Sequence, residues 1–393
     1  MEGDVNNQTM VDINGRERPV RWGSGNIRTN RRFVPRSVYT DPARHEAESN
    51  LLRNSWLFGC LEQEIPEAGD TSLFEALGQS VLIVRQKDGS VLAWHNVCQH
   101  RGARLACTSQ KKVRRFVCPY HAWSFGLDGA LTGVPGREYY TKEELADMRT
   151  PPVAAAVRHG IVWINMGENP QPIDDIFGEV GEELTGFNLD QMKLIAEPME
   201  FDIPANWKRG LEAFLEDYHA PSLHSPSLPT GNMPGQVDYT LTTHTLFESN
   251  SMMVYTPKDT LTELRATLDH FRFGYNHYLI YPCTIMNFME GPSGVWQVWD
   301  FLPVSVNQAK MRMRFLAGPN FQMEHDVRNA TVAYLRQVFG EDIFACGEQS
   351  ATDHSLGNQG SLLGDAECRI AHLYDCLDRD LGIETPGAVP WAK

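Results

Sequence analysis

The sequence lacks the features of several common protein classes. Basic residues are in the minority, with 35 Lys and Arg against 50 Asp and Glu in 393 residues, and the formal net charge is −15. Nucleic acids and anionic membranes require a basic surface, so neither is expected as a partner. No stretch approaches the roughly 20 apolar residues of a membrane-spanning helix, and the first residues lack the pattern of a secretory leader. We therefore expect a cytoplasmic protein.

Paired cysteines and nucleotide-binding motifs are also missing. The eight cysteines show no spacing typical of a disulfide framework, which fits a reducing compartment. Neither a G-x-G-x-x-G stretch after a strand nor a P-loop occurs, so no dinucleotide site is predicted, and electrons from NAD(P)H would have to arrive through another protein. The composition, 42% hydrophobic and 22% charged, is ordinary for a globular protein, and the length predicts two domains.

Two short loops each offer one thiolate and one imidazole, in the order C-x-H (Cys98–His100) and C-x-x-H (Cys118–His121). Zinc and [2Fe-2S] clusters both accept these ligands. A zinc finger usually has two cysteines in one loop and two histidines on a helix. A Rieske cluster instead binds both thiolates to one iron and both imidazoles to the other. The pattern therefore favours a Rieske cluster over structural zinc, with Cys98, His100, Cys118 and His121 as its ligands.

Short strands are expected around these loops. The segments that favour strands are Trp56–Leu61, Val91–Asn96, Arg114–Cys118 and Gly160–Asn165. Gly102 would let backbone amides approach the sulfides of a cluster. We expect Trp123 and Phe125 to pack beneath the loops, and Cys60 and Cys107 to be buried as small apolar groups.

The predicted domain limits follow from where the strand-rich segment around the two loops begins and ends. Residues 1–53 are expected to form an arm and a helix, Pro42–Arg53, that begins at an Asp41 cap and packs on the catalytic domain. Residues 54–167 should form an all-β Rieske domain, and residues 168–393 a catalytic domain. In the last, the predicted helices and strands are Ala205–Ala220, 240–256, 272–289, 295–303, 309–317, Phe321–Phe339 and Ala366–Leu381. Strands followed by helices indicate an antiparallel sheet with helices on one side, so the whole chain is predicted to be α+β.

A second pair of possible metal ligands lies at the end of the predicted helix Ala205–Ala220. His219 and His224 are five residues apart, and five residues turn an unbroken helix by about 500°, which would separate the two rings. Pro221 should end or kink the helix after His219, so that His224 can return beside it. A histidine on a helix is more often structural than ligating. However, a one-electron cluster needs an acceptor, and iron held by two histidines and a carboxylate leaves positions open for O2.

The segment Asn206–Lys208 (N-W-K) and the segment Glu212–His219, with His224 beyond them, are similar to a family pattern. Together with the two Cys/His loops they make nearly the whole chain resemble the catalytic α subunit of a Rieske non-haem iron oxygenase. That family has a Rieske domain followed by a helix-grip catalytic domain. The resemblance implies that His219 and His224 bind mononuclear Fe(II) and that Glu216 bridges the two metal sites. The sequence departs from the pattern at Ala213, where Asn is frequent, and at Ala122, where Gly usually follows the second loop.

The resemblance also implies a carboxylate ligand near the end of the chain. The family places an Asp in an E-D pair before a helix, which corresponds to Asp342. Glu341, Glu348 and Asp353 remain alternatives, and Asp342 could equally be the N-terminal cap of a helix.

As implied by the resemblance, the chain is expected to be a terminal oxygenase component in the catabolism of aromatic compounds. It would use O2 and NAD(P)H electrons, delivered by a reductase with or without a ferredoxin, to hydroxylate or cis-dihydroxylate an aromatic compound, with an aromatic acid as the leading class. A homotrimer is implied, with or without a small β subunit. Alternatives are N- or O-demethylation of a small methylated compound, a Rieske electron carrier, and a zinc-stabilised binding protein. For an aromatic acid the candidate basic groups are Arg209, Arg272, Arg312 and Arg314.

Overall fold

A computed structural model of the chain divides into two compact units, one over residues 49–191 and the other over residues 1–48 and 192–393. It describes residues 8–11, 17–20, 32–178, 181, 184–185, 188–216, 219, 223, 237–240, 246–249, 275–289, 295–318, 325–364 and 367–384. Within these residues no helix is long and apolar enough to cross a membrane. The predicted limits 54 and 167 lie inside the first of these units, and as domain limits they stay a prediction.

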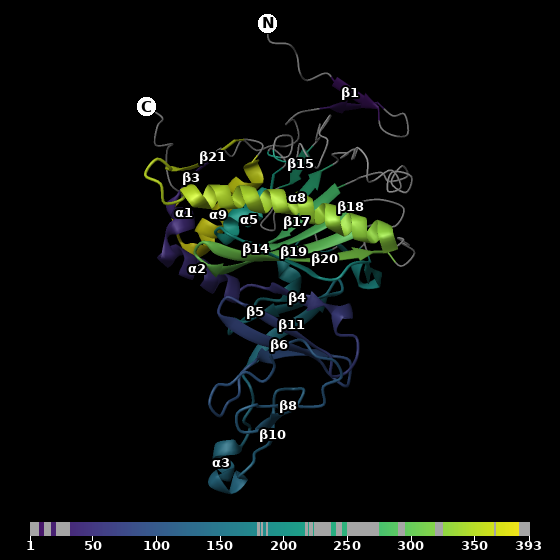
Figure 1. Ribbon diagram of the computed structural model, residues 1–393, viewed down its shortest axis with the longest axis vertical. Coiled ribbons are helices and arrows are strands. Elements are labelled where there is room, and N and C mark those ends of the chain that lie inside the picture. The colour runs from purple at the N-terminus through teal and green to yellow at the C-terminus, as the bar shows by residue number, and fades with distance from the viewer. Residues whose placement is uncertain are drawn as a thin grey trace. The chain divides into compact units, whose positions relative to one another are not determined.

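The 49–191 unit is built from two antiparallel sheets (Figure 1). The six-stranded sheet has the order β4-β12-β11-β7-β6-β5, and the three-stranded sheet has the order β10-β9-β8. Their bounds are β4 Leu57–Leu61, β5 Thr71–Ala76, β6 Gln79–Arg85, β7 Val91–His95, β8 Phe116–Val117, β9 Ser124–Phe125, β10 Leu131–Gly133, β11 Pro152–Arg158 and β12 Ile161–Asn165. The short helices are η2 Glu62–Glu64, η3 Arg137–Tyr139, α3 Lys142–Leu145, η4 Ile173–Ile176 and η5 Leu189–Gln191. The four predicted strands of this region are confirmed.

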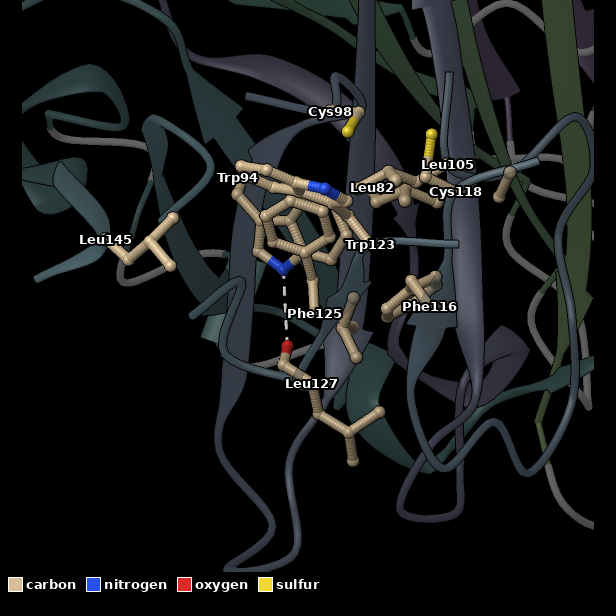
Figure 2. Packing of buried hydrophobic residues seen from close by; sticks show 12 residues of the cluster. Leu82, Trp94, Cys98, Leu105, Phe116, Cys118, Trp123, Phe125, Leu127 and Leu145 are labelled. Atoms are coloured by element: carbon tan, nitrogen blue, oxygen red, sulfur yellow. Dashed lines mark hydrogen bonds between the residues drawn. The ribbon is translucent and has the colours of Figure 1, made fainter. Parts of the chain in front are cut away.

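A buried aromatic cluster supports the two Cys/His loops (Figure 2). Trp94 packs edge-to-face on Phe116 at 4.9 Å between ring centres, and its indole N–H donates to the Leu127 carbonyl at 3.2 Å. Trp123 and Phe125 belong to the cluster, as predicted. Of the two other cysteines, Cys60 is buried as expected. The expectation for Cys107 is wrong: it is exposed, because it lies in the irregular segment between the loops and not in a strand.

The other unit contains an eight-stranded antiparallel sheet of order β13-β20-β19-β18-β17-β16-β15, with β14 also paired to β20. The bounds are β13 Lys193–Leu194, β14 Met199–Ile203, β15 Val237–Thr240, β16 Leu246–Ser249, β17 Tyr275–Ile280, β18 Thr284–Met289, β19 Val295–Ser305 and β20 Gln308–Ala317. The single strand predicted over 272–289 is wrong, because a turn at residues 281–283 divides it. Pro282 in that turn lacks the N–H that a continuous strand needs. Of the strand predicted over 240–256, residues 246–249 form β16, and residues 241–245 and 250–256 lie outside the described part of the chain.

Helices and two small strand pairs complete this unit. Their bounds are β1 Gln8–Val11, β2 Glu17–Val20, β3 Arg32–Pro35, α1 Ser37–Thr40, α2 Pro42–Arg53, α5 Trp207–Ala213, α8 His325–Thr352, β21 Gly360–Leu363 and α9 Cys368–Leu381. Helix α2, whose last turn belongs to the 49–191 unit, has the predicted bounds, and the Asp41 carboxylate accepts from the Ala43 N–H at 2.8 Å. Helix α5 contacts α8, β19 and β20, and α8 runs along the sheet (Figure 1). The predicted α+β class is confirmed.

Two predicted helix ends are wrong. Helix α5 ends at Ala213 and not near Ala220, because the chain closes a tight turn there: the Leu215 N–H donates to the Glu212 carbonyl at 2.9 Å. Leu215 is fully buried, and the ring of Phe214 lies 5.0 Å from that of Trp299. Tertiary packing of these two side chains therefore outweighs continuation of the helix.

Helix α8 does not stop at Phe339 but continues through Gly340 to Thr352. A glycine costs about 1 kcal/mol relative to alanine in a helix. Burial of Phe339, Asp342 and Cys346, spaced three and four residues apart on one face, offsets that cost. Asp342 is thus inside a helix, and its alternative role as an N-terminal cap is excluded.

Candidate metal centres

The two Cys/His loops of the 49–191 unit repeat one backbone turn. In each loop the cysteine N–H donates to the carbonyl five residues later, and the cysteine carbonyl accepts from the N–H four residues later, at 2.8–3.0 Å. The residue four positions after each cysteine has a positive φ, which is 77° at Gly102 and 57° at Ala122. This conformation costs an alanine about 1–2 kcal/mol. The departure from the family pattern at Ala122 is therefore a strained position where glycine would not be strained.

The candidate cluster ligands of these loops converge. Cys98 and Cys118 are 2% and 3% exposed, and Figure 2 shows both sulfur atoms at one edge of the aromatic cluster. The imidazole rings of His100 and His121 lie 4.6 Å apart, and within the described residues the buried Nδ1 of each ring has no hydrogen-bond partner. Two thiols and two imidazole nitrogens without another role fit the ligand set of a Rieske cluster.

Burial raises the pKa of the Cys98 thiol, and the Cys118 thiol beside it raises that pKa further. The backbone N–H groups of His100 and Arg101 act in the opposite direction, because they stabilise a thiolate at Cys98. The loop therefore supplies donors for a negatively charged sulfur, which is the form that binds iron.

The two imidazoles have different surroundings. His100 stacks on Trp123 at 4.7 Å with an angle of 7° between the planes, and its Nε2 lies 3.3 Å from the hydroxyl of Tyr140. His121 is covered instead by the ring of the exposed Tyr120, at 3.8 Å between ring centres. The outer nitrogen of His100 is thus engaged within its own unit.

In the other unit, the structure brings together three side chains that the sequence analysis named. Nε2 of His219 lies 3.3 Å from Oδ1 of the buried Asp342, although 123 residues separate them. On the other side of the ring, Nδ1 of His219 hydrogen-bonds to a carboxylate oxygen of Glu216, whose second oxygen accepts from the His219 N–H at 3.1 Å. Such a carboxylate fixes the tautomer and orientation of a ligating histidine. Nε2 is therefore directed toward Asp342 and is available to a metal.

Negative charge is concentrated around His219. Burial alone would lower the pKa of this imidazole, but its contacts with Asp342 and Glu216 raise the pKa to about 10. A group of two carboxylates around one imidazole favours a bound cation, so the donors fit a ferrous ion. His224, the other predicted histidine, and Pro221 lie outside the described residues.

The rival carboxylates near Asp342 are placed differently. Asp353 accepts from the Arg209 guanidinium at 2.8 Å in a buried ion pair. Glu348 is exposed, and Glu341 is the sequence neighbour of Asp342 on helix α8. Of these four carboxylates, Asp342 lies beside Nε2 of His219.

Four aromatic side chains pack together, and two of them, Phe214 and Phe339, are close in sequence to these candidate ligands. Phe214 contacts Trp299, Phe301 and Phe339 at 5.0, 5.4 and 5.7 Å between ring centres. Phe339 precedes Asp342 by three residues on α8, and all but Phe214 are at most 5% exposed. The sequence alone did not indicate Phe301 or Phe339, because their closeness depends on strand and helix pairing.

A buried polar group next to the iron-site segment was also missed. Glu212 accepts hydrogen bonds from the hydroxyls of Tyr39 and Tyr374, and Arg209 lies 3.7 Å from its other oxygen. Burial raises the pKa of Glu212. Its partners lie up to 173 residues away in the sequence, so no local signal could have indicated them.

Comparison with known proteins identifies the two units. A model of the Rieske [2Fe-2S] domain matches residues 55–146, and a model of the ring hydroxylating alpha subunit (catalytic domain) matches residues 191–382. The chain belongs to the Rieske oxygenase alpha subunits. These domains carry a Rieske [2Fe-2S] cluster and a mononuclear iron, and the donor sets described above fit both groups.

Individual relatives are similar over different lengths. The glycine betaine monooxygenase oxygenase subunit of Chromohalobacter salexigens is 32% identical over 192 residues, 49% of this chain and 43% of that relative. The chain thus matches less than half of that relative's length. The carnitine monooxygenase oxygenase subunit of Escherichia coli K12 is 26% identical over 88% of this chain and 92% of that relative. A crystal structure of the quaternary ammonium Rieske monooxygenase CntA superposes with a TM-score of 0.76 and 24% identity, over 91% of this chain and 96% of that one.

Proposed function

We propose that this chain is the oxygenase component of a system that hydroxylates a carbon next to the nitrogen of a small quaternary ammonium compound. This is the demethylation-type alternative of the sequence analysis, preferred here over an aromatic acid. The contact between His219 and Asp342, beside an aromatic cluster, carries the proposal. The names of the glycine betaine and carnitine relatives support the substrate class.

Two donor sets would hold the metals. Cys98, His100, Cys118 and His121 would hold the cluster, which supplies electrons one at a time. His219 and Asp342, with His224, would hold the ferrous ion, which binds and activates O2 when its remaining positions are open. In this proposal the Rieske domain spans residues 54–167 and the catalytic domain spans residues 168–393.

The protein's own groups have separate tasks in this scheme. Glu216 holds His219 through Nδ1 and keeps Nε2 directed at the metal position. Phe214 and Phe339, whose rings both pack against Trp299, would keep water away from the metal position. One oxygen atom of O2 enters the C–H bond, and the other leaves as water after uptake of two electrons and two protons. The bond between the hydroxylated carbon and the nitrogen then breaks, which releases the amine and a proton and leaves the carbon as an aldehyde.

The aromatic cluster suits a quaternary ammonium substrate. A cation lying over aromatic faces gains about 0.5–2 kcal/mol, most at a desolvated site. A quaternary ammonium group has no N–H, so it cannot donate the hydrogen bonds that a polar pocket would accept. By contrast, two of the arginines named for an aromatic acid are neutralised in buried ion pairs. Arg209 pairs with Asp353, and Arg312 pairs with Asp300.

Electron delivery is proposed to follow the family pattern. A separate reductase, with or without a ferredoxin, would supply NAD(P)H electrons, and a homotrimer would let an electron pass from the cluster of one copy to the iron of the next through Glu216. A small β subunit is not required by this scheme.

Ring hydroxylation of an aromatic compound is the second candidate, because the matching catalytic-domain model is that of ring hydroxylating alpha subunits. A single-turnover experiment separates the two. Dithionite-reduced protein containing both metals is mixed with ¹⁸O2 and either glycine betaine, L-carnitine or an aromatic acid such as benzoate, and the products are analysed by mass spectrometry.

We expect cluster oxidation and C–N cleavage with an ammonium compound, and no product from the aromatic acid. The His219→Ala variant is the control and should give no product from either class. Incorporation of ¹⁸O into the aromatic acid alone would favour ring hydroxylation. Absence of product from every compound would favour an electron carrier.

A further inference from the structure

Aromatic side chains of the 49–191 unit hold the ring of His100 in a fixed plane. The imidazole stacks on the indole of Trp123, at 4.7 Å between ring centres and with 7° between the planes. The ring of Tyr140 stands nearly perpendicular to both, 6.2 Å from His100 and 5.3 Å from Trp123. Trp123 is 3% exposed and belongs to the buried aromatic cluster (Figure 2). The orientation of the imidazole is therefore determined by side chains of its own unit.

The hydroxyl of Tyr140 adds a hydrogen bond to this ring. Its oxygen lies 3.3 Å from Nε2 of His100. The other ring nitrogen, Nδ1, is buried and has no hydrogen-bond partner within the described residues, so it is the nitrogen available to an iron of the cluster. A neutral imidazole that binds a metal through one nitrogen carries its proton on the other. Nε2–H of His100 therefore donates, and the Tyr140 oxygen accepts.

Local structure on both sides of Tyr140 fixes the place of this hydroxyl. The Tyr140 N–H donates to the Arg137 carbonyl at 3.1 Å, where η3 ends. The next residue, Thr141, caps helix α3: its hydroxyl accepts from the Glu144 N–H at 3.2 Å, and the Glu144 carboxylate accepts from the Thr141 N–H at 2.8 Å. Leu145, at the end of α3, is 7% exposed and packs in the buried aromatic cluster (Figure 2). The contact with His100 is thus part of a built structure.

The two candidate histidine ligands differ in this contact. The ring of His121 lies against that of Tyr120, and in the part of the chain that the structure describes its Nε2 has no hydrogen-bond partner. His100 alone of the two has an acceptor at its outer nitrogen within its own unit. The hydroxyl of Tyr140 therefore acts on one imidazole of the pair.

This hydrogen bond has a predictable effect on a cluster bound at Nδ1. An acceptor at the far N–H of a ligating histidine draws the proton away from the ring and makes the imidazole a stronger electron donor to the metal. Reduction adds one electron to the cluster, so higher electron density at a ligand opposes it. The hydrogen bond therefore stabilises the oxidised cluster relative to the reduced cluster.

We propose that the Tyr140 hydroxyl, through its hydrogen bond to His100, lowers the reduction potential of the Rieske cluster and so makes the reduced cluster a stronger one-electron donor. Tyr140 acts through His100 and is not itself a ligand. The inference rests on the ligand set given under the proposed function and is independent of the substrate. In the reduction, one electron passes from the reductant to the cluster, and no bond forms or breaks.

A redox titration of the protein that contains its cluster tests this. Dithionite is added in steps with mediator dyes at pH 7, and the visible spectrum gives the midpoint potential. We expect Tyr140→Phe to raise the equilibrium constant for reduction about threefold, which corresponds to about 30 mV for a one-electron couple. The matched control is Tyr139→Phe, the same change at the neighbouring tyrosine, which is 81% exposed, and it should leave the potential unchanged.

A second variant leaves the hydroxyl in place but loosens its support. Thr141→Ala removes the cap of α3, and we expect it to raise the potential by less than Tyr140→Phe does. Pulsed EPR of the reduced cluster supplies a signature that altered packing alone would not give. The nitrogen coupling of one of the two histidine ligands should change in Tyr140→Phe, and both couplings should stay the same in Tyr139→Phe.

An unshifted or lowered potential in Tyr140→Phe, or equal shifts in Tyr140→Phe and Tyr139→Phe, would overturn the inference. If Tyr140→Phe does not retain its cluster, Thr141→Ala decides, and an unchanged potential in that variant has the same consequence. A wild type without a Rieske spectrum would instead refute the ligand set of the proposed function. A normal spectrum with an unshifted potential refutes this inference alone.

Discussion

At the scale of single residues, Glu216 has the most informative position. It contacts both the ring and the backbone N–H of His219, and that ring faces Asp342. In the predicted helix Ala205–Ala220, Glu216 and His219 are three residues apart and would lie on nearly the same face. The structure instead brings them together after helix α5 has ended. The contact therefore depends on the turn at Phe214 and Leu215 and not on helical periodicity.

We predict that Glu216→Gln keeps the mononuclear iron but lowers turnover by about 10–100-fold, as is common when the carboxylate behind a ligating histidine is lost. The amide can still accept from His219, but it no longer carries the charge that stabilises and orients the imidazole. Iron content and the rate of cluster oxidation in a single turnover of pre-reduced protein measure the two effects. Glu348→Gln, an exposed change on helix α8, is the control. Cluster oxidation at the wild-type rate in Glu216→Gln would refute the role.

At the scale of elements, buried polar contacts join strands to distant helices. His277 on β17 is fully buried, and its Nδ1 accepts from the Arg369 guanidinium of α9 at 3.0 Å, so the imidazole is neutral. Burial lowers the pKa of His277 well below its ordinary value, and the positive charge of Arg369 lowers it further. In the unfolded chain His277 thus binds a proton near pH 6.5, whereas in the folded chain it stays neutral at that pH.

The sign of this shift predicts acid sensitivity. Stability from His277 is complete above the ordinary histidine pKa and is lost as the pH falls below about 6.5. We predict that His277→Asn, which keeps an acceptor for Arg369, reduces the fall in Tm between pH 7.5 and pH 5.5. The exposed His354→Asn should leave that fall unchanged. If the Tm of His277→Asn falls as steeply as that of the wild type, His277 does not contribute to acid sensitivity.

Some of these elements and contacts could be predicted from the sequence, and others could not. The Cys/His loops and the strands leading into them are local in sequence, so spacing and alternation were sufficient to locate them. Asp342 was chosen by resemblance, but the continuation of α8 through Gly340 was not predicted, because a glycine directly after a helical stretch is a usual signal for the end of a helix. The aromatic contacts of Phe339 and the partners of Glu212 require tertiary pairing, which no local pattern encodes.

At the scale of the whole molecule, the chain combines a Rieske [2Fe-2S] domain with the catalytic domain of a ring hydroxylating alpha subunit. The first is identified by its match to the Rieske domain model, and it contains the four candidate cluster ligands. The second is identified by the catalytic-domain match and the contact between His219 and Asp342. The central claim is that one chain holds both metal groups in separate ligand sets.

Iron and acid-labile sulfide, measured per chain in the wild type and two variants, test this claim most directly. We predict about three irons and two sulfides in the wild type, because a [2Fe-2S] cluster and one ferrous ion are bound. Asp342→Ala should retain about two irons and the visible Rieske spectrum, and Cys98→Ser should lose the spectrum and the sulfide but keep about one iron. Zinc in place of iron, or a Cys98→Ser variant that retains the cluster spectrum, would contradict the account.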